Sequence, residues 1–174
     1  LSLHDALPIS MLCARLYTPA KIIAVDIDEY RLNLAREKGL ADIILVPGKD
    51  DIEGEVRSAA AGRGADVVFE AAGGEDTFQT AWKIARPNAV VVFEAMYERP
   101  QALPLPDMYG KNLVFKTGGV DGSYCQEIMD LTSCGKLDTD FLITHRCGFG
   151  EILEAYDIFE NKKDHVLKYA VTFL

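Results

Sequence analysis

One acidic residue closes an apolar run near the start of the chain. Asp26 follows Ile22-Ile-Ala-Val25, and Asp28 stands two positions later. A carboxylate at the end of such a strand can accept hydrogen bonds from both hydroxyls of an adenosine ribose. It also disfavours a 2′-phosphate, because two like charges a few ångströms apart cost about 1 kcal/mol in water. Asp26 therefore favours NAD over NADP, unless it only caps the next helix, a role that Asp28 can take instead.

The phosphate loop that should accompany this acid is missing. The pattern G-x-G-x-x-G is expected about 15 to 20 residues before the ribose-binding acid. That window falls at residues 5–11, which contain no glycine. Met11–Leu16 fits the body of the helix that would follow the loop, and Ser10 falls where the last glycine is expected. S-adenosylmethionine-dependent methyltransferases place an acid at the same point for the same ribose, so that alternative stays open here.

Histidines and cysteines offer little further chemistry. His145 stands beside Arg146 and far along the chain from any nucleophile, which favours a structural role where the chain returns from the sheet domain. The cysteines are scattered without a C-x-x-C pair, which indicates reduced thiols, buried or incidental, and no zinc site. They are Cys13, Cys125, Cys134 and Cys147.

Composition narrows the class of protein. The chain has 174 residues, 49% hydrophobic and 26% charged, which is ordinary for a globular protein. Its net charge of −9 argues against a nucleic-acid surface, which needs a basic stripe, but not against one small phosphorylated ligand. We find neither an apolar run long enough to cross a membrane nor a signal peptide in the sequence. We therefore expect a cytoplasmic protein with no membrane partner.

Four aliphatic runs recur at near-constant intervals. They begin at residues 22, 43, 67 and 90: Ile22–Val25, Ile43–Val46, Val67–Phe69 and Val90–Phe93. Each is continuously apolar, as expected for a strand covered on both faces. Helical segments lie between them, at Asp28–Lys38, Asp50–Ala61 and Glu75–Ala85. Strand and helix alternation with right-handed crossovers predicts an α/β fold with a doubly wound parallel sheet that is Rossmann-like but lacks its first strand and glycine loop.

The rhythm breaks over residues 97–110. Pro100, Pro104 and Pro106 exclude a regular helix or a central strand there. The segments expected after the break are a strand at Asn112–Lys116, a helix at Tyr124–Cys134, an apolar block at Phe141–Thr144, an amphipathic helix from Ile152 to Phe159 and a final strand at Leu167–Phe173.

Longer stretches carry a family resemblance. The sequence from Ala20–Asp26 through Ala65–Gly73 resembles the medium-chain dehydrogenase/reductase superfamily. Asp107–Gly119, Ile143–Arg146 and Tyr169–Phe173 are similar to its zinc-dependent alcohol dehydrogenase branch, nearest to secondary-alcohol, polyol and threonine dehydrogenases. The similarity covers roughly residues 11–174. Each motif alone is weakly specific, whereas their order and spacing together are strongly so.

The resemblance suggests three parts of the chain. Leu1–Ile9, which contains no initiator methionine, resembles one reading frame of a widely used sequencing-adapter oligonucleotide. Residues 1–10 are therefore expected to be an artefactual leader, the alternative being a natural start. Residues 11–142 correspond to an NAD-binding domain truncated at its N-terminus. Residues 143–174 correspond to a segment that returns toward a catalytic domain.

The resemblance also implies a cofactor site at the strand ends. Asp26 matches the ribose-binding acid, Arg31 a basic residue beside that ribose, and Lys168 a basic residue near the pyrophosphate. The backbone of three residues is expected to pass under the two riboses: Ala71, Ala72 and Gly73. Three more are expected to meet the nicotinamide: Phe93, Glu94 and Ala95. Thr117 and Gly118 match the loop that holds the carboxamide. Glu94 departs from the small or aliphatic residue usual at its position.

The implied activity is hydride transfer from a small secondary alcohol to NAD, with a catalytic zinc that polarises the alkoxide. The family's zinc ligands lie in its N-terminal catalytic domain, so we expect neither a metal site nor turnover in this chain. A missing central strand should leave a gap in the sheet and make the fragment prone to aggregation. The family pairs cofactor domains through an edge strand, which predicts a homo-oligomer through Leu113–Lys116.

Three alternatives remain at this stage. A zinc-free quinone reductase of the same superfamily is disfavoured by Asp26, because those enzymes usually take NADPH. A methyltransferase sheet normally ends in an antiparallel hairpin, whereas this chain continues through a proline-rich segment into Thr117-Gly-Gly119. A non-catalytic NAD-binding module is the third alternative.

Overall fold

The computed structural model describes residues 6–118 and 122–173, which form two compact units. Unit 1 holds residues 20–118, and unit 2 combines residues 6–19 with residues 122–173. The first five residues of the expected leader, and Gly119 of the carboxamide loop, lie outside the described residues. The two units are compact bodies of the folded chain. The predicted boundary at residue 142 is of another kind, because it divides the NAD-binding domain from a segment that returns toward a catalytic domain. That boundary therefore stays a prediction.

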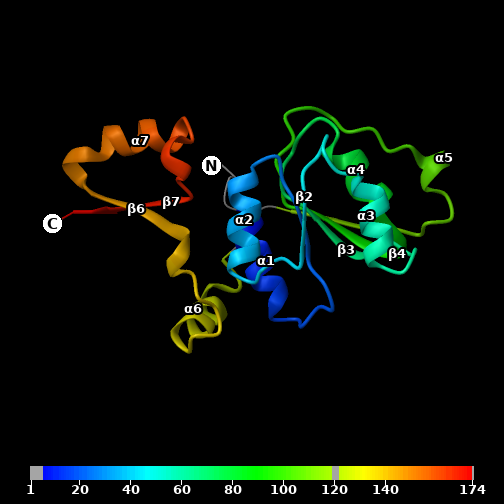
Figure 1. Ribbon diagram of the computed structural model, residues 1–174, viewed down its shortest axis with the longest axis horizontal. Helices are drawn as coiled ribbons and strands as arrows, with labels where there is room; N and C mark the ends of the chain where they lie inside the picture. The colour runs from blue at the N-terminus through cyan, green and yellow to red at the C-terminus, as the bar shows by residue number, and fades with distance from the viewer. Residues whose placement is uncertain (1–5, 119–121, 174) are drawn as a thin grey trace. The chain divides into compact units, whose positions relative to one another are not determined.

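Unit 1 is built on five parallel strands. They are β1 (Ile23–Val25), β2 (Ile43–Leu45), β3 (Ala65–Glu70), β4 (Ala85–Phe93) and β5 (Val114–Thr117). β1 pairs with β2 in one sheet, and β3, β4 and β5 pair in that order in another (Figure 1). All five expected strands are confirmed. β4 begins earlier than expected because Ala85 already pairs with Ala65, before a register irregularity.

Helices connect these strands, as the sequence predicts. They are α2 (Glu29–Glu37), α3 (Ile52–Ala59) and α4 (Thr77–Ile84), with α3 and α4 side by side over the three-stranded sheet in Figure 1. The Asp28 side chain accepts hydrogen bonds from two backbone N–H groups at the start of α2, and Asp51 caps α3 in the same way. The α/β fold with parallel strands and crossover helices is confirmed.

The proline-rich segment contains one short helix, although its prolines were predicted to exclude one. α5 (Leu105–Met108) is a single turn that follows Pro104 and carries Pro106 near its start. Proline is tolerated there because the first N–H groups of a helix have no partner within the helix. The expectation of no helix was wrong at this turn, while the rest of residues 97–104 is irregular as expected.

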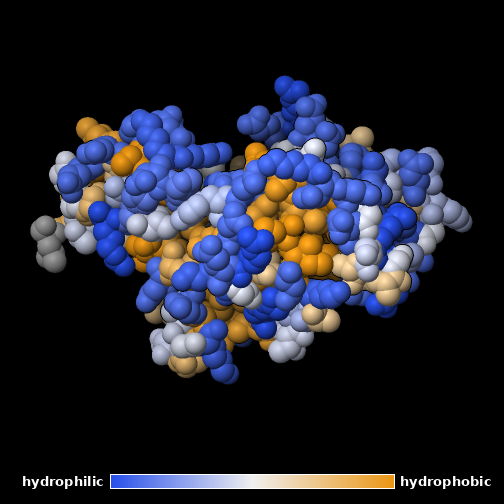
Figure 2. Space-filling view, in the orientation of Figure 1, coloured by the Kyte–Doolittle hydropathy of each residue, from blue (hydrophilic) through white to orange (hydrophobic). Residues whose placement is uncertain are grey.

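The predicted gap in the sheet is present. Among the described residues, no strand pairs with β1 except β2, and β3 pairs only with β4. Two apolar side chains of β3 are about half exposed, Val67 at 49% and Phe69 at 48%. Figure 2 shows hydrophobic residues at the surface beside β2 and β3. Side chains typical of a covered strand thus lie open beside the free edge of β3.

One hydrophobic core nevertheless joins the two sheets of unit 1. Leu45 of β2 belongs to the same buried cluster as Val68 of β3 and Val91 of β4, together with Val56 of α3 and Ile84 of α4. Ile23 and Val25 of β1 pack against it. Burial of apolar surface therefore holds β1 and β2 beside the larger sheet without a connecting ladder.

Unit 2 is built from two stretches of the chain, residues 6–19 and 122–173. Its main elements are α1 (Ala6–Arg15), α6 (Cys125–Ser133), β6 (Ile143–Gly148), α7 (Ile152–Glu160) and β7 (Lys168–Thr172), with short 3₁₀ helices at Asp140–Leu142, Phe149–Glu151 and Lys163–His165. β6 and β7 are parallel. The expected helices and the final strand are confirmed, while the block at Phe141–Thr144 is shared between a 3₁₀ helix and β6. α1 begins inside the expected leader, at Ala6.

Two further observations concern the described residues as a whole. No helix there is long and apolar enough to span a membrane. The cysteines form no disulfide among these residues, and none of them is buried: Cys125 and Cys134 are exposed and the other two are partly exposed. The expectation of buried thiols was therefore wrong, and their incidental character stays a prediction.

Candidate functional site

Asp26 lies directly after β1, at the carboxyl end of that strand. Its own N–H donates to the Leu45 carbonyl oxygen at 3.3 Å, which continues the β1–β2 pairing past the end of the strand. Its Oδ1 accepts the Asp28 N–H at 2.9 Å. The side chain is 15% exposed. An ionised carboxylate has about four lone-pair sites, so acceptor capacity for hydroxyl donors remains.

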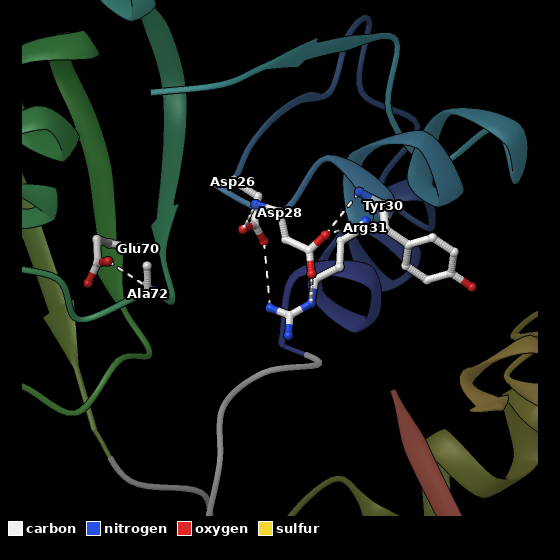
Figure 3. A network of polar contacts seen from close by, with 6 residues as sticks. All are labelled: Asp26, Asp28, Tyr30, Arg31, Glu70 and Ala72. Carbon is white, nitrogen blue, oxygen red and sulfur yellow. Dashed lines mark hydrogen bonds and ion pairs between the residues drawn. The ribbon is translucent and has the colours of Figure 1, made fainter. Parts of the chain in front are cut away.

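Arg31 lies beside this acid, as the resemblance implies. Its Nη1 is 3.8 Å from Asp26 Oδ2, and its Nε is 3.4 Å from Asp28 Oδ2. The arginine side chain is 13% exposed. Figure 3 shows the guanidinium between the two carboxylates. One cation is thus shared by two acids, because the N-cap of α2 and the end of β1 are two residues apart.

A second acid occupies the end of β3, and the sequence reading assigned it no role. Glu70 is 5% exposed, and its Oε1 accepts the N–H group of Ala72 at 2.9 Å (Figure 3) and that of Gly73, also at 2.9 Å. A buried carboxylate needs such donors, because burial without partners is costly. The signal was available: an acid that closes an apolar run, followed by two small residues and a glycine, repeats the placement of Asp26.

Gly73 shapes the same loop. Its φ is +67°, in the left-handed region, and a Cβ there would lie 2.8 Å from the Met96 carbonyl oxygen. A side chain at this position would therefore be strained and would collide with backbone. The loop after β3 consequently lies against the segment that follows β4.

Residues after β4 complete this arrangement. The N–H groups of Glu94 and Ala95 donate to the Glu70 carbonyl oxygen at 2.9 and 3.2 Å. The Tyr97 hydroxyl donates to Glu70 Oε2. Burial, together with the hydrogen bond to Glu70, raises the pKa of the Tyr97 hydroxyl above its usual range, so it stays a donor at neutral and mildly alkaline pH.

Phe93 has a packing role in addition to its predicted place in the site. Its ring stacks on Phe78 with centroids 5.1 Å apart and also meets Tyr97 and Phe115. This aromatic cluster fixes the end of β4. The predicted contact of Phe93 with the nicotinamide therefore stays a prediction for a residue whose ring already has neighbours.

Strand register places the predicted residues along one edge. Glu70 pairs with Phe93, and Phe93 pairs with Thr117, so the three neighbouring strands end side by side. Thr117 and Gly118 are exposed there. The carboxyl edge of parallel strands is where α/β folds bind ligands. The structure therefore brings the residues that follow β3, β4 and β5 to one edge of one sheet.

Comparison with known proteins identifies the family. Residues 9–133 match the family model of zinc-binding dehydrogenases. The chain belongs to the zinc-binding dehydrogenase family. This match covers all the predicted site residues except Lys168, and it removes the methyltransferase alternative.

Individual relatives point the same way. An alcohol dehydrogenase from Cupriavidus necator is 30% identical over 164 residues, which are 91% of this chain and 44% of that protein. A sorbitol dehydrogenase from Arabidopsis thaliana is 34% identical over 87% of this chain and 42% of its own length. A crystal structure of an alcohol dehydrogenase from Escherichia coli CFT073, complexed with NADH, matches with a TM-score of 0.83 at 25% identity, over 95% of this chain and 48% of that one. The chain thus spans about half the length of these dehydrogenases.

Lys168 belongs to a different unit from the other predicted site residues. It is the first residue of β7, in unit 2, and its side chain is exposed. Its carbonyl oxygen accepts the Thr144 hydroxyl at 3.3 Å. Its predicted role near the pyrophosphate stays a prediction about the dehydrogenase as a whole.

His145 has contacts that fit the structural role predicted for it. Its Nδ1 is 2.9 Å from Thr144 Oγ1, its Nε2 is 3.2 Å from Asp164 Oδ2, and its ring lies 5.2 Å from that of Tyr169. These contacts hold β6, β7 and the turn before β7 together. Within residues 6–118 and 122–173, no three His, Cys, Asp or Glu side chains gather as a metal site.

Proposed function

We propose that this chain is the cofactor-binding part of a dehydrogenase that uses NAD and zinc to oxidise a secondary alcohol or a polyol. The family supports the reaction class, and the alcohol and sorbitol dehydrogenases among its relatives support the substrate class. Because the chain spans less than half of either relative, the activity is proposed for a longer parent protein. The scattered cysteines support a cytoplasmic location for it.

The observation that carries this proposal is the Asp26 carboxylate at the end of β1. It is held by the Asp28 N–H and by Arg31, and it stays partly exposed with unused acceptor capacity. The two ribose hydroxyls of an adenosine are donors that fit this acceptor. When bound, NAD supplies the carbon that accepts the hydride. The chain's own residues bind and orient it: Asp26 at the adenosine ribose, and the backbone after β3, β4 and β5 toward the nicotinamide.

The same geometry favours NAD over NADP. A 2′-phosphate would bring about two negative charges to a place that already holds two carboxylates. Arg31, the cation paired with these acids, is shared by Asp26 and Asp28. Like charges at this distance repel by about 1 kcal/mol in water and more when partly desolvated. We therefore expect at least fivefold tighter binding of NAD than of NADP, since 1.4 kcal/mol corresponds to about a factor of ten.

Titration calorimetry of this chain with NAD and NADP tests the proposal. In the Asp26→Asn variant we expect NAD affinity to fall about tenfold and the preference over NADP to shrink. The matched control is Glu37→Gln, which removes one exposed carboxylate from the far end of α2. If the natural chain prefers NADP, the ribose assignment is wrong and the quinone-reductase alternative returns.

We further propose that the catalytic zinc is held by residues of the parent outside this chain, and that this chain alone does not oxidise alcohols. The sequence resemblance supports both points. Metal analysis of the purified chain and an assay of NADH formation with a polyol test them together. Stoichiometric zinc or measurable turnover would contradict this part of the proposal.

The parent is also proposed to form a homo-oligomer through the edge strand Leu113–Lys116. The structure supports it in two respects: β5 is the last strand of its sheet, and Val114 is 49% exposed. A cavity of about 480 Å³ beside it is lined by residues of α5, of the connection between α5 and β5, and by Phe115 of β5, and Tyr109 in its lining is 92% exposed. An unpaired strand edge next to exposed apolar surface is suited to pairing with a second copy.

A further inference from the structure

Glu70 is the only charged side chain that is buried among the described residues. A carboxylate in the protein interior costs several kcal/mol unless hydrogen bonds replace its water shell. Glu70 has three such bonds from three different residues. Two N–H groups of the loop after β3, those of Ala72 and Gly73, donate to Oε1, and the Tyr97 hydroxyl donates to Oε2.

All three partners of the Glu70 side chain are hydrogen-bond donors. Two backbone N–H groups and one phenol hydroxyl are all donors here, and a carboxylate that only accepts matches all three. A protonated carboxyl would bring a fourth hydrogen into the same cluster. The raised pKa of Tyr97 keeps the phenol a donor in this arrangement. Each oxygen of the Glu70 carboxylate therefore accepts at least one hydrogen bond from within the chain.

The backbone of Glu70 adds a second connection. Its carbonyl oxygen accepts the N–H groups of Glu94 and Ala95, at 2.9 and 3.2 Å. One residue at the end of β3 thus holds both the loop that follows its own strand and the segment that follows β4. Gly73 closes the contact from the other side, because a Cβ there would lie 2.8 Å from the Met96 carbonyl oxygen.

We propose that Glu70 is a positioning residue for the cofactor, which holds the 71–73 loop and the 94–97 segment in one shape before NAD binds. The inference rests on the proposed NAD site, since these are the two segments assigned to the riboses and the nicotinamide. A loop fixed in advance loses less conformational freedom on binding, so the gain appears as affinity. Tyr97 contributes to the same positioning through its hydrogen bond to Glu70. The family resemblance assigned a role to neither residue.

Three variants separate positioning from simple stability. Glu70→Ala removes all three side-chain bonds. Glu70→Gln keeps an acceptor for Ala72 and Gly73, and its amide can meet the Tyr97 hydroxyl oxygen. Tyr97→Phe removes one bond and leaves the loop N–H groups paired. Glu37→Gln is again the charge-matched control.

Two readouts are taken on each folded variant of the whole chain. The first is amide hydrogen exchange at Ala72 and Gly73 without ligand, followed by NMR. The second is NAD affinity by calorimetry. We expect Glu70→Ala to lose at least tenfold of the exchange protection and at least tenfold of the affinity. Glu70→Gln should recover most of both, and Tyr97→Phe should lose a few-fold of each.

The outcomes separate this inference from the function on which it rests. If exchange protection at Ala72 and Gly73 is unchanged in all three variants, Glu70→Ala, Glu70→Gln and Tyr97→Phe, these hydrogen bonds do not hold the 71–73 loop. If protection is lost but NAD affinity is not, Glu70 is structural and the positioning role is overturned. If the natural chain binds no NAD while exchange protection still depends on Glu70, the proposed NAD binding fails for this chain. Glu70 then holds the two segments together but does not position a cofactor.

Discussion

Two strands of unit 1 end in an acid, and the two acids behave differently. Asp26 after β1 is partly exposed, accepts one backbone N–H and shares an arginine with Asp28. Glu70 at the end of β3 is buried, and its carboxylate is used by two N–H groups and one hydroxyl of its own chain. Both acids stand at the carboxyl end of a strand, Asp26 directly after β1 and Glu70 as the last residue of β3, so burial and the number of internal donors distinguish them. An acid with most of its acceptor capacity unused can bind a ligand, whereas one that already accepts three hydrogen bonds within the chain organises the loops around it.

Removing each acid should show this contrast most strongly in the free energy of unfolding. Glu70→Ala leaves two N–H groups and a phenol without their acceptor, and hydrogen bonds to charged groups contribute roughly 1.5 to 3 kcal/mol each. We expect a loss of about 3 kcal/mol, against about 1 kcal/mol or less for Asp26→Ala. Urea unfolding followed by circular dichroism measures both. Equal losses would mean that the two acids have the same structural role.

Gly73→Ala tests the close approach of the two loops. Gly73 and Gly48 both have positive φ, +67° and +84°, but only at Gly73 would a Cβ meet backbone. Gly48→Ala therefore measures the conformational cost alone, about 1 kcal/mol. We expect Gly73→Ala to cost about 2 to 3 kcal/mol, because the Met96 carbonyl must also move. The difference between the two variants in thermal unfolding gives the cost of that contact, and no difference would show that the loops are not held together.

The sequence predicted much of this fold because its signals were local. Asp28 as a helix cap, Gly39 as a left-handed helix end and the apolar runs of the strands each depend on neighbouring residues. The meeting of Glu70 with Tyr97 does not, since they lie 27 positions apart and meet only through the register of β3 with β4. Asp26 was singled out because its place after a strand is a local pattern. Glu70 was missed because the three hydrogen bonds that it accepts form only in the folded chain.

Tyr97→Phe sharpens the comparison through pH. The variant removes one donor to Glu70 and should cost about 1 kcal/mol at neutral pH. Burial and the bond to Glu70 raise the pKa of Tyr97 in the folded chain, so its contribution is fully present below the unfolded value of about 10. As pH rises above about 10 the unfolded phenol ionises first, and the advantage of the natural chain over Tyr97→Phe should shrink. Unfolding free energies measured from pH 8 to pH 11 test this, and a constant difference over that range would contradict the buried hydrogen bond.

Asp66→Asn gives the smallest expected effect and completes the comparison with a third acid. Asp66 lies within β3, bonds to Arg86 Nε at 2.5 Å, and its side chain is 68% exposed. The hydrogen bond to Arg86 lowers the pKa of Asp66, so any stabilisation is present above the unfolded value of about 3.9 and is lost as pH falls through the lower folded value. Solvent screening limits such an exposed pair to roughly 0 to 1 kcal/mol, and we expect less than about 0.5 kcal/mol at 0.15 M salt.

The Asp66→Asn result would separate two properties that Asp26 combines, an arginine partner and a place at the carboxyl end of a strand. Asp66 and Asp26 each have an arginine partner, but only Asp26 stands at the carboxyl end of a strand, with an N–H bond that fixes its position. If Asp66→Asn leaves both NAD affinity and stability unchanged, the arginine alone does not make a carboxylate functional. If instead it lowers NAD affinity as much as Asp26→Asn does, general loss of negative charge explains both variants. The placement of Asp26 at the strand end would then not be what selects the ligand.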